Sequence, residues 1–449
     1  MRKNRKADVA IIGGGASGLA AAVELGMSSP ELSVLVIEKM KEPGRKLRAT
    51  GSGRCNIANA EAAGIECIKE FFSDIGLMIK TNRDGLMYPY SESAANVVSI
   101  ITDRAASLGC EFCCEEEAIK IKKCEGGGFE IESAYKDKDG SHSMITEANY
   151  IILACGGKAA PNYGTTGDGY RLAKELGHSV VTPVPVLTGI ECAEWNANIV
   201  PDAHIMAGTR TTGRISLYKR EAGEAPTYPT TEKSVFPNEY PNKEPFFTEK
   251  GEIQFTKYGL SGICVFNMSR LMRLNKEEGE RFEDYCIKLN LFPEGSFSDY
   301  LNSVSQGKFA KNPLKTVFIL AFKESVARYI IESLNENAGC KTAMNNGAGD
   351  FCDKSLYRLS AEDIRLVCEA VHGLEFHPIN LRGWKDAQVT SGGVSMNEID
   401  KKTAESKLVK GLYITGELAD RDFPCGGFNL SNAWLTGISA ADDIAAKER

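Results

Sequence analysis

Three glycines near the N-terminus have the spacing of a turn that binds phosphate groups. Gly13, Gly15 and Gly18 form the pattern Gly-x-Gly-x-x-Gly within the segment DVAIIGGGASGLAAAVELG. The first glycine permits a tight turn, the second lets the backbone approach a pyrophosphate, and the third permits close packing of helix on strand. A helix beginning with Ala16 and Ser17 would point its free N–H groups and partial positive charge at the phosphates.

The glycine pattern lies between the elements that a dinucleotide site needs. Residues 7–12 and 32–38 are short β-branched apolar runs, and residues 16–26 are apolar at helical spacing. Strand, turn, helix and strand in this order are the βαβ unit of a doubly wound sheet. Glu38 closes the second strand, where its carboxylate would accept hydrogen bonds from a ribose. These features predict dinucleotide binding; the alternative is a glycine-rich turn without a ligand.

A second segment, GRKLRATGSGRCNIAN at residues 44–59, indicates which dinucleotide is bound. It holds four cationic side chains and three glycines, and it has neither a helical nor a strand period, so we expect a loop. A nicotinamide dehydrogenase would continue with a further helix and strand, whereas this loop favours a longer ligand, FAD. Gly51 and Gly53 would let the backbone approach it, and Arg54 would face the flavin or a substrate anion. The alternative is a surface loop whose cations are solvated.

The composition limits the remaining classes of function. The chain has 449 residues, 25% of them charged, and a net charge of -7, so we expect two or three domains. The mild acidity gives no electrostatic footprint for nucleic acid or an anionic membrane, which makes a small-molecule substrate the favoured partner and a membrane partner not expected. No apolar run has the roughly 18–20 residues that span a bilayer. The opening MRKNRK is expected to be a solvated lead-in and not a signal peptide. The 14 cysteines are mostly scattered, which predicts a cytoplasmic protein with reduced thiols.

Later segments alternate between strand-like and helix-like patterns. A small antiparallel meander and a buried strand after it are predicted at 117–123, 129–135, 143–149 and 150–154. In the middle of the chain, helices are predicted to start after Pro313 and at Ser360, which would be an N-cap. Alternating β/α character returns at 387–394 and 411–415, and a final helix begins at about Asn429.

These elements predict an α/β fold built from both ends of the chain. The FAD-binding domain would comprise residues 1–186 and 387–449. A β-rich, barrel-like insertion would comprise residues 187–295 and 373–386, and a helical subdomain would comprise residues 296–372.

Five segments of the chain resemble one bacterial family. They are ATGSGRCNIAN, LACGGKAAPNYGTTGDGYRLAKELGH, FTKYGLSG, QVTSGGV and GELADRDFPCGGFNLSNAW, and they occur in the order seen in YhiN/BaiN-like flavoproteins. Members are FAD-dependent oxidoreductases, described as aminoacetone oxidases or as enone reductases of bile-acid metabolism. The resemblance covers nearly the whole chain. It implies the two-dinucleotide-binding-domain flavoprotein fold, with FAD in the split Rossmann-like domain.

The resemblance also implies which residues hold the cofactor. Glu38 and Lys39 match the adenosine ribose end, the backbone of Ala118 matches a position near adenine, and Cys155 stands where threonine is usual. A helix N-terminus at Gly427 would face the pyrimidine edge of the flavin. The FAD-binding set predicted from the pattern and the resemblance is Gly13, Gly15, Ala16, Ser17, Gly18, Glu38, Lys39, Lys46, Thr50, Gly51, Gly53, Arg54, Cys55, Asn56, Ala118, Ala154, Cys155, Gly156, Gly157, Gly167, Asp168, Gly416, Glu417, Gly427, Asn429 and Leu430.

The candidates for catalysis are less well determined than those for cofactor binding. The sequence offers Arg54, Lys257, Arg421 and Tyr163, and Lys257 stands where the family has a histidine. Cys425 lies beside the flavin-facing glycines, where a packing role is expected. The pair Cys110 and Cys113 is the only Cys-x-x-Cys, and we expect incidental thiols there, not a redox dithiol. Cys368 and His372 share a helical face without a second ligand pair, so no metal site is expected.

The predicted function is that of an FAD-dependent oxidoreductase. Hydride would move between flavin N5 and a small or steroid-like substrate held between the α/β domain and the insertion. NAD(P)H would serve as a transient reductant, and because the sequence has no second Gly-x-Gly-x-x-Gly, it would bind where the substrate binds. The favoured reaction is reduction of a conjugated ketone of the bile-acid type.

Three alternatives stay open at this point. An aminoacetone-type oxidase would pass electrons to oxygen. A flavoprotein acting on RNA would use the basic segment RTTGRISLYKR at residues 210–220. A structural flavin carrier would have no turnover. The oligomeric state is left open.

Overall fold

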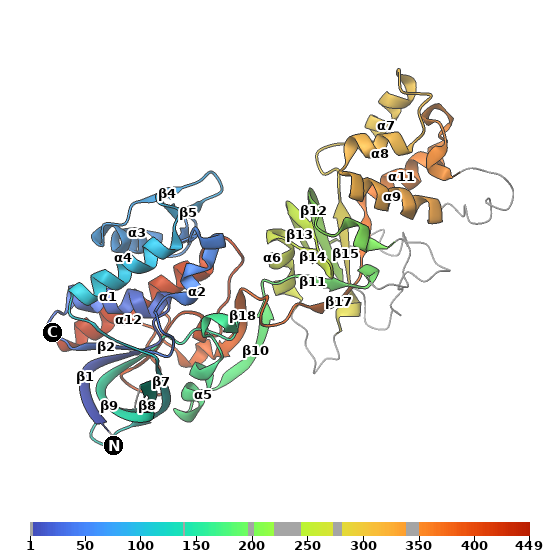
Figure 1. Cartoon of the computed structure of the whole chain (residues 1–449). Helices are drawn as coiled ribbons and strands as arrows, with labels where there is room; N and C mark the ends of the chain where they lie inside the picture. The colour runs from blue at the N-terminus through green and yellow to red at the C-terminus, as the bar shows by residue number, and fades with distance from the viewer. Residues whose placement is uncertain (1–2, 138–139, 196–201, 220–243, 273–280, 338–349) are drawn as a thin grey trace. The chain divides into compact units, whose positions relative to one another are not determined.

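The computed structural model describes residues 3–137, 140–195, 202–219, 244–272, 281–337 and 350–449. The chain forms two compact units, one of Met1–Val186 with Gly383–Arg449 and one of Leu187–Arg382 (Figure 1). We call them the first and the second unit. The arginine-rich segment at 210–220 is described as far as Lys219, and Arg220 lies outside the described residues.

A parallel sheet forms the centre of the first unit. Its strands lie in the order β6 (Glu111–Cys114), β2 (Val34–Glu38), β1 (Lys3–Ile12), β9 (Gly140–Leu153) and β19 (Leu412–Ile414). The last strand comes from the C-terminal part of the chain and pairs Leu412 with Ile151. The Rossmann-like α/β fold and its assembly from both chain ends are therefore confirmed.

Strand β9 is one element where two were expected. Its pairing with β1 keeps one register from Met144 to Leu153, with the pair expected between Asp8 and Asn149 missing. The first part of β9 also pairs with β8 (Phe129–Asp137), which pairs in turn with β7 (Glu116–Lys123), and these pairings are antiparallel. The expected meander is present, but the boundary predicted between residues 149 and 150 is wrong because β1 continues as the partner across it.

The N-terminal charges are part of the sheet. Strand β1 begins at Lys3, so the segment is part of the fold and not a lead-in before it, although the side chain of Lys6 is solvated, as expected, with 81% of its surface exposed. The guanidinium of Arg5 makes an ion pair with Glu116 on β7, whose side chain is 6% exposed. Ser133 on β8 donates a further hydrogen bond to the same carboxylate. A cation near the start of the chain thus neutralises a buried acid of the meander.

Helices α1 (Ala16–Ser28), α4 (Ala94–Ser107) and α12 (Phe428–Glu448) belong to the main core of the first unit. Figure 1 shows α1 and α12 side by side. Gly437 makes this possible, since a Cβ there would lie 2.2 Å from the carbonyl oxygen of Ser17. Trp434 is fully buried and donates to the carbonyl of Ile57 at 2.9 Å. A helix α3 (Ile65–Asp74) and three short strands, β3 (Ala58–Asn59), β4 (Ile79–Thr81) and β5 (Leu86–Pro89), complete this part.

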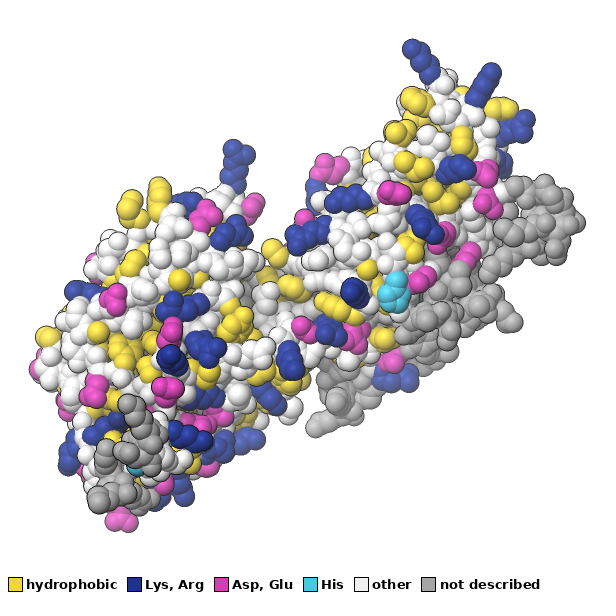
Figure 2. All heavy atoms as spheres, viewed as in Figure 1, with side chains coloured by type: hydrophobic (Ala, Val, Ile, Leu, Met, Phe, Trp, Pro, Cys, Tyr) yellow, Lys and Arg dark blue, Asp and Glu magenta, His cyan; other side chains and the backbone are white. Residues whose placement is uncertain are grey.

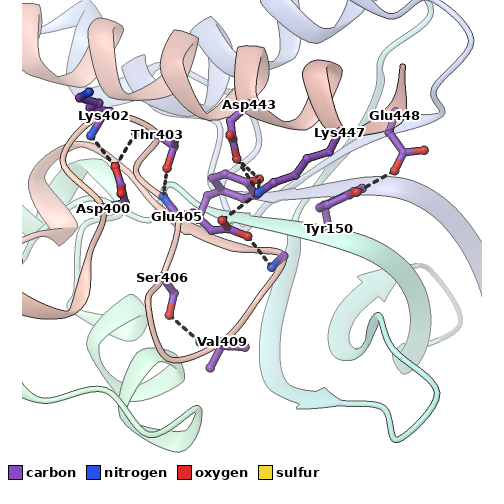
Figure 3. Close-up of polar contacts among 12 residues, drawn as sticks. Tyr150, Asp400, Lys402, Thr403, Glu405, Ser406, Val409, Asp443, Lys447 and Glu448 are labelled. Carbon is purple, nitrogen blue, oxygen red and sulfur yellow. Dashed lines mark hydrogen bonds and ion pairs between the residues drawn. The ribbon is translucent and has the colours of Figure 1, made fainter.

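A polar network fixes the far end of α12 (Figure 3). The ammonium of Lys447 lies 2.6 Å from Asp443 and 2.8 Å from Glu405. The hydroxyl of Tyr413 donates to Asp443 at 2.7 Å, and Tyr150 donates to Glu448 at 2.6 Å. Because these contacts join α12 to strands β19 and β9, they hold the helix in line with the sheet and so place its N-terminus.

In the part of the second unit that the structure describes, seven strands form one sheet. Its order is β16 (Leu374–Phe376), β15 (Tyr285–Asn290), β12 (Arg210–Lys219), β13 (Phe247–Phe255), β14 (Gly259–Ser261), β11 (Ile190–Cys192) and β17 (Pro378–Leu381). The two edge strands, β16 and β17, are separated in the chain by His377 alone. One bent segment therefore joins both edges, which gives the barrel-like arrangement expected.

The helices of the second unit share the core of this barrel. They are α6 (Ile263–Leu271), α7 (Phe297–Gln306), α8 (Lys315–Ala321), α9 (Glu324–Asn337) and α11 (Ala361–His372). Phe255 and Phe376 of the sheet belong to one buried cluster with Phe297 and Phe318 of the helices. The β-rich and helical segments, expected as separate subdomains, thus form one compact unit that ends at Arg382.

Of the two helix starts predicted in this region, the N-cap at Ser360 is confirmed, and the helix predicted after Pro313 is shorter than its sequence pattern. Ser360 is the N-cap of α11 and accepts a hydrogen bond from the Asp363 N–H at 3.2 Å. Pro313 precedes α8, but the helical pattern after it breaks at Phe322, which has an extended backbone.

None of the described helices combines the length and the apolar character needed to cross a bilayer. Basic and acidic side chains both occur over the visible face of each unit (Figure 2).

Candidate dinucleotide-binding site

The turn between β1 and α1 contains glycines with two different roles. Gly13 has a φ of +106°, and a Cβ there would lie 2.6 Å from the carbonyl oxygen of Ala154; a Cβ at Gly18 would lie 2.0 Å from the oxygen of Gly13. The packing of the protein itself requires these two glycines. Gly15 has an ordinary φ of −79°, and the nearest protein atom to a Cβ there is 3.9 Å away. The described residues leave open space at Gly15, at the position where a Gly-x-Gly-x-x-Gly turn would admit a pyrophosphate.

The start of α1 is suited to an anion. Gly15 is the N-cap, no described side chain caps this end, and the first turn contains no acid. The N–H groups of Ala16 and Ser17 therefore stand at the positive end of the helix dipole. The hydroxyl of Ser17 has another role, since it accepts a hydrogen bond from Thr415 at 3.2 Å inside the core. Ser17 would thus meet a ligand through its backbone.

Glu38 is held at the end of β2 by the glycine turn. Its carboxylate accepts hydrogen bonds from the N–H of Gly14 at 2.8 Å and from the N–H of Met40 at 2.7 Å. Burial raises the pKa of Glu38, and the two N–H groups offset part of this rise. Each carboxylate oxygen keeps a lone pair, so the predicted role of Glu38 as acceptor of ribose hydroxyls stays a prediction that this geometry allows.

Lys39 and Asp168 contact each other. The ammonium of Lys39 makes an ion pair with Asp168 and a 2.6 Å hydrogen bond to Thr166. Asp168 is the first residue of α5 (Asp168–Glu175), which follows Gly167 with a φ of +88°. Burial alone would raise the pKa of Asp168, but hydrogen bonds from Lys39 and Thr166 lower it. The pair is thus an ionised link between the end of β2 and the start of α5.

A cleft of about 480 Å³ lies where the sequence predicts the adenosine end of the site. It lies between the residues after β2 and the meander, and it is lined by Lys39, Met40, Lys41, Arg45, Glu115, Glu117, Ala134, Tyr135, Lys136 and Ser141. Ala118 follows Glu117 on β7 and is 6% exposed. Its side chain belongs to the core, so only its backbone is positioned to meet an adenine.

Another group of contacting residues lies where β9, β18 (Val389–Val394) and the turn after β19 meet. Glu417 receives the Lys46 ammonium at 2.7 Å and the Thr390 N–H at 2.8 Å. Gly157 lies against the same two groups, since a Cβ there would be 2.3 Å from Thr390 Oγ1 and 2.5 Å from Glu417 Oε1. Gly416 precedes Glu417 with a φ of +64°. Thr390 is a residue that sequence reasoning missed, because a buried threonine within a strand has no distinctive spacing.

The turn after β9 contains a thiol with a raised pKa. Cys155 follows the buried Ala154, and its thiol donates to the carbonyl of Ile12 at 3.4 Å. Burial raises the pKa of Cys155 to about 12, so it takes the place of the usual threonine as a packed thiol. Gly156 then turns the chain with a φ of +69°.

The cationic segment is partly helical, contrary to the expectation of a loop. Residues Arg45–Arg48 form the short helix α2, and Thr50–Gly53 form a 3-10 turn η1. Gly51 and Gly53 have φ values of +58° and +85°, and Ser52 between them has +57°. These short turns escape a periodicity search because neither is long enough to show a period. The left-handed backbone explains why glycines occur here.

The cations of this segment have different partners. Arg48 faces Glu42 at 3.6 Å. Arg54 is exposed, its guanidinium lies 5.3 Å from the ring centre of Tyr88, and its Nε donates to the carbonyl of Gly51 at 3.3 Å. The aromatic face holds Arg54 while its other N–H groups face outward.

Other residues predicted in this segment mainly support its structure. Thr50 donates to the carbonyl of Leu47 at 2.7 Å. Cys55 is fully buried, and burial raises the pKa of its thiol to about 11. The amide of Asn56 is oriented so that its oxygen and its nitrogen both have partners. The oxygen accepts a hydrogen bond from the Gly427 N–H at 3.1 Å, and the nitrogen donates one to the carbonyl of Ala58 at 3.0 Å. Asn56 therefore joins the segment to the start of α12.

Helix α12 presents its N-terminus without a side-chain cap among the described residues. Gly427 is the N-cap with a φ of +94°. Asn429 turns its amide back to the preceding loop, accepting from the Phe423 N–H at 3.0 Å and donating to the Phe423 carbonyl at 2.8 Å. The N–H groups of Phe428, Asn429 and Leu430 stand at the positive end of the helix.

The candidate catalytic residues are each described within their own unit. Tyr163 is 39% exposed in a short 3-10 helix. Arg421 is exposed and lies over the ring of Phe423 at 5.1 Å. Lys257 is exposed in the second unit, between β13 and β14. Their roles as acid or base therefore stay predictions.

The Cys-x-x-Cys pair has the features of packed thiols. Cys110 is buried and donates to the carbonyl of Ala22 at 3.2 Å, while Cys113 accepts from Arg5 at 2.9 Å. Burial raises the pKa of both thiols to about 11. The two sulfurs have separate partners, which supports the prediction of incidental thiols.

Both ring nitrogens of His372 have hydrogen-bond partners within the protein. Its Nδ1 lies 3.0 Å from the amide oxygen of Asn290, and its Nε2 accepts from the Phe297 N–H at 3.4 Å. Neither ring nitrogen is directed to a metal shared with Cys368.

The fold and the site together define an FAD-dependent oxidoreductase with a Rossmann-like domain. An open glycine turn, an acid at the end of β2 and two uncapped helix starts suit the phosphates, ribose and flavin of one dinucleotide. The chain belongs to the HI0933-like family, whose model, described as "HI0933-like protein Rossmann domain", matches residues 7–70 and 64–443. The resemblance predicted from the sequence is confirmed.

The chain is similar to two curated relatives and, in its fold, to one solved structure. The 3-dehydro-bile acid delta(4,6)-reductase of Clostridium scindens is 30% identical over 466 positions, covering 98% of this chain and 99% of the relative. The ribosomal RNA dihydrouridine synthase of Escherichia coli is 24% identical and covers 98% of each chain. The solved structure of 3-ketosteroid-delta4-(5alpha)-dehydrogenase from Rhodococcus jostii matches with a TM-score of 0.46 and 12% identity, over 98% of this chain and 97% of that one.

Proposed function

We propose that this protein is an NAD(P)H-dependent reductase of conjugated ketones on a steroid-like scaffold, such as a bile acid. The observation that carries the proposal is the 30% identity to a bile-acid delta(4,6)-reductase along the full length of both chains. Such a reaction adds a hydride equivalent to the β carbon of the enone and a proton to its α carbon. Flavin, when bound, supplies the hydride equivalent.

The described residues would hold the cofactor at three places. The open face of Gly15 with the start of α1 would bind the pyrophosphate, and Glu38 would bind the adenosine ribose. Glu417, fixed by Lys46 and Thr390, would orient the ribityl end.

Two features of the first unit would stabilise negative charge during the reaction. The N–H groups at the start of α12 provide a fixed positive potential without a titratable group. Arg54, held by Tyr88, provides a cation that does not depend on pH. A negative charge that develops on the reduced cofactor or on an enolate would be stabilised by both.

The test is anaerobic turnover with NADH or NADPH and a panel of acceptors. A conjugated 3-ketosteroid should support oxidation of the nicotinamide, and the product should be heavier by two hydrogen atoms. Oxygen with aminoacetone is the comparison for an oxidase. If nicotinamide is consumed only with oxygen, and the steroid is recovered unchanged, the proposal is wrong.

A second candidate is reduction of uridine in ribosomal RNA, which the Escherichia coli relative favours. Uracil also contains a carbon–carbon double bond conjugated to a carbonyl, so the same site chemistry would serve. The second unit has a cleft of about 620 Å³ lined by Arg210, Lys323 and Arg328, among others. Incubation of the reduced protein with an unmodified ribosomal RNA transcript, followed by mass analysis of the nucleosides, separates the two candidates.

A further inference from the structure

Three side chains of the barrel in the second unit gather on one face of its sheet. Strands β15 and β16 are antiparallel, with Lys288 opposite Glu375 and Ile287 opposite Phe376. Cys286 therefore stands beside His377, and side chains two residues apart along a strand point to the same side. Cys286, Glu375 and His377 face the same space, although Cys286 is far from the other two in the sequence.

The three groups have the composition and spacing of a metal site. One sulfur, one carboxylate oxygen and one imidazole nitrogen all lie within 4.8 Å of one another. All three residues are buried, with Cys286 at 0%, Glu375 at 3% and His377 at 6% exposure. Thiolate, imidazole and carboxylate are the ligands that zinc prefers in proteins.

His377 is oriented as a metal ligand is. Its Nδ1 lies 2.6 Å from a carboxylate oxygen of Glu194, a residue that is 1% exposed. The same carboxylate also accepts the backbone N–H of His377, at 3.0 Å to one oxygen and 3.1 Å to the other. With the proton held on Nδ1 by Glu194, the lone pair of the imidazole is on Nε2. A carboxylate that holds one ring nitrogen in this way is the usual second contact of a zinc-bound histidine.

Glu375 has one oxygen engaged and one available. The ammonium of Lys288 lies 2.8 Å from Oε1. Oε2 is buried and has no hydrogen-bond partner among the described residues. A buried carboxylate oxygen without a partner is costly, and a cation in the cluster would remove that cost.

We propose that Cys286, Glu375 and His377 bind a zinc ion, with a water molecule as the fourth ligand. Binding forms a sulfur–zinc bond and breaks the S–H bond, and the proton passes to solvent. The net charge of the cluster is then zero, because Zn²⁺ and the Lys288 ammonium carry three positive charges and the Cys286 thiolate, Glu375 and Glu194 carry three negative charges. The ion would tie β15 to the bend at His377 that joins the two edges of the barrel, which is a structural role.

The competing arrangement contains no metal. In it, His377 would be an imidazolium between the carboxylates of Glu194 and Glu375, and Cys286 would remain a neutral thiol. This arrangement is also electrically balanced, so the two are distinguished by metal binding and by the state of the thiol.

The experiment uses the full-length protein with its flavin, dialysed against buffer containing a small excess of zinc and then against metal-free buffer. Metal analysis should find zinc in a ratio near one per chain. Replacement of zinc by Co²⁺ should add a thiolate-to-cobalt absorption band in the near ultraviolet, seen in the difference spectrum against the zinc form. Cys286→Ser should lose this band, and His377→Gln should lose the bound zinc.

The controls separate ligation from folding. Cys264→Ser removes another buried cysteine of the same unit, whose thiol donates to a backbone carbonyl, and it should keep both zinc and the cobalt band. Glu194→Gln should weaken zinc binding by about 10- to 100-fold. A folded wild-type protein that retains no zinc and shows no thiolate–cobalt band would overturn the proposal, even if the variants failed to fold.

Discussion

The ammonium of Lys46 lies 2.7 Å from a carboxylate oxygen of Glu417, although 371 positions separate the two residues in the chain. Both side chains are largely buried, with 26% and 19% of their surface exposed. The pair joins the cationic segment near the N-terminus to the turn after β19. The predicted cofactor site is thus assembled from both ends of the chain, and this contact holds the two parts together.

Replacing Lys46 with methionine should weaken FAD binding by about tenfold. The change leaves the partly buried carboxylate of Glu417 without its cation, and a loss of about 1–2 kcal/mol corresponds to roughly that factor. The measurement is a titration of the deflavinated protein with FAD, followed by flavin fluorescence. Arg48→Met is the matched control, because its pair with Glu42 is 3.6 Å long and more exposed. Equal losses in both variants would show that the Lys46 contact has no special role.

Gly15→Val should abolish FAD binding and leave the protein folded. A Cβ at this position meets no protein atom closer than 3.9 Å, so the new side chain would fill only the space assigned to the pyrophosphate. Gly18→Val is the contrasting variant, since its Cβ would lie 2.0 Å from the oxygen of Gly13, and it should lower the stability of the fold itself. Flavin absorbance and thermal unfolding of both variants are the measurements. Full FAD occupancy in folded Gly15→Val would place the pyrophosphate elsewhere.

Arg54→Ala should keep the fold and part of the FAD but slow turnover by on the order of 100-fold, as expected for the loss of one fixed electrostatic contact. The flavin midpoint potential should fall, because the reduced, anionic form loses a nearby cation. Potentiometric titration and steady-state rates are the measurements. The exposed Arg421, which lies over Phe423, provides the comparison as Arg421→Ala. An unchanged potential in Arg54→Ala would mean that this arginine is a solvated surface charge.

The sequence was sufficient to predict the elements that have long or regular patterns. The βαβ unit at the N-terminus, the meander and the N-cap at Ser360 follow from periodicity and capping, which act over neighbouring residues. The structure differs where pairing with a distant strand decides the outcome. Strand β9 continues through position 150 because β1 pairs with it on both sides.

In the candidate site too, residues defined by spacing within one segment were predicted, and residues that depend on contacts with other parts of the chain were not. The glycine turn and Glu38 were predicted because the spacing within one segment defines them. Thr390 and the role of Asn56 were not predicted, since each depends on contact with a residue from another part of the chain. The burial of Cys55 likewise depends on packing that no local pattern records.

Stability should fall as the pH rises from about 5 to about 7, and Glu24 should contribute to this. Burial on α1, together with the charges of Asp442 and Asp74, raises the pKa of Glu24 to about 7 from an ordinary value of 4.5. The folded protein therefore binds more protons than the unfolded chain between these values, and each proton lost costs stability. Thermal unfolding at pH 5 and pH 8 should show a smaller difference for Glu24→Gln than for the wild type. An identical difference in the two proteins would show that Glu24 titrates normally.

The most direct test of the proposed function is the reoxidation of the reduced flavin. The protein is reduced anaerobically with light and a deazaflavin, so that no nicotinamide is present, and then mixed with a conjugated 3-ketosteroid or with oxygen. The account predicts that the flavin absorbance returns faster with the steroid than with oxygen at equal concentration, and that one steroid is reduced per flavin. Return of the absorbance with oxygen alone, and no reaction with the steroid, would contradict it.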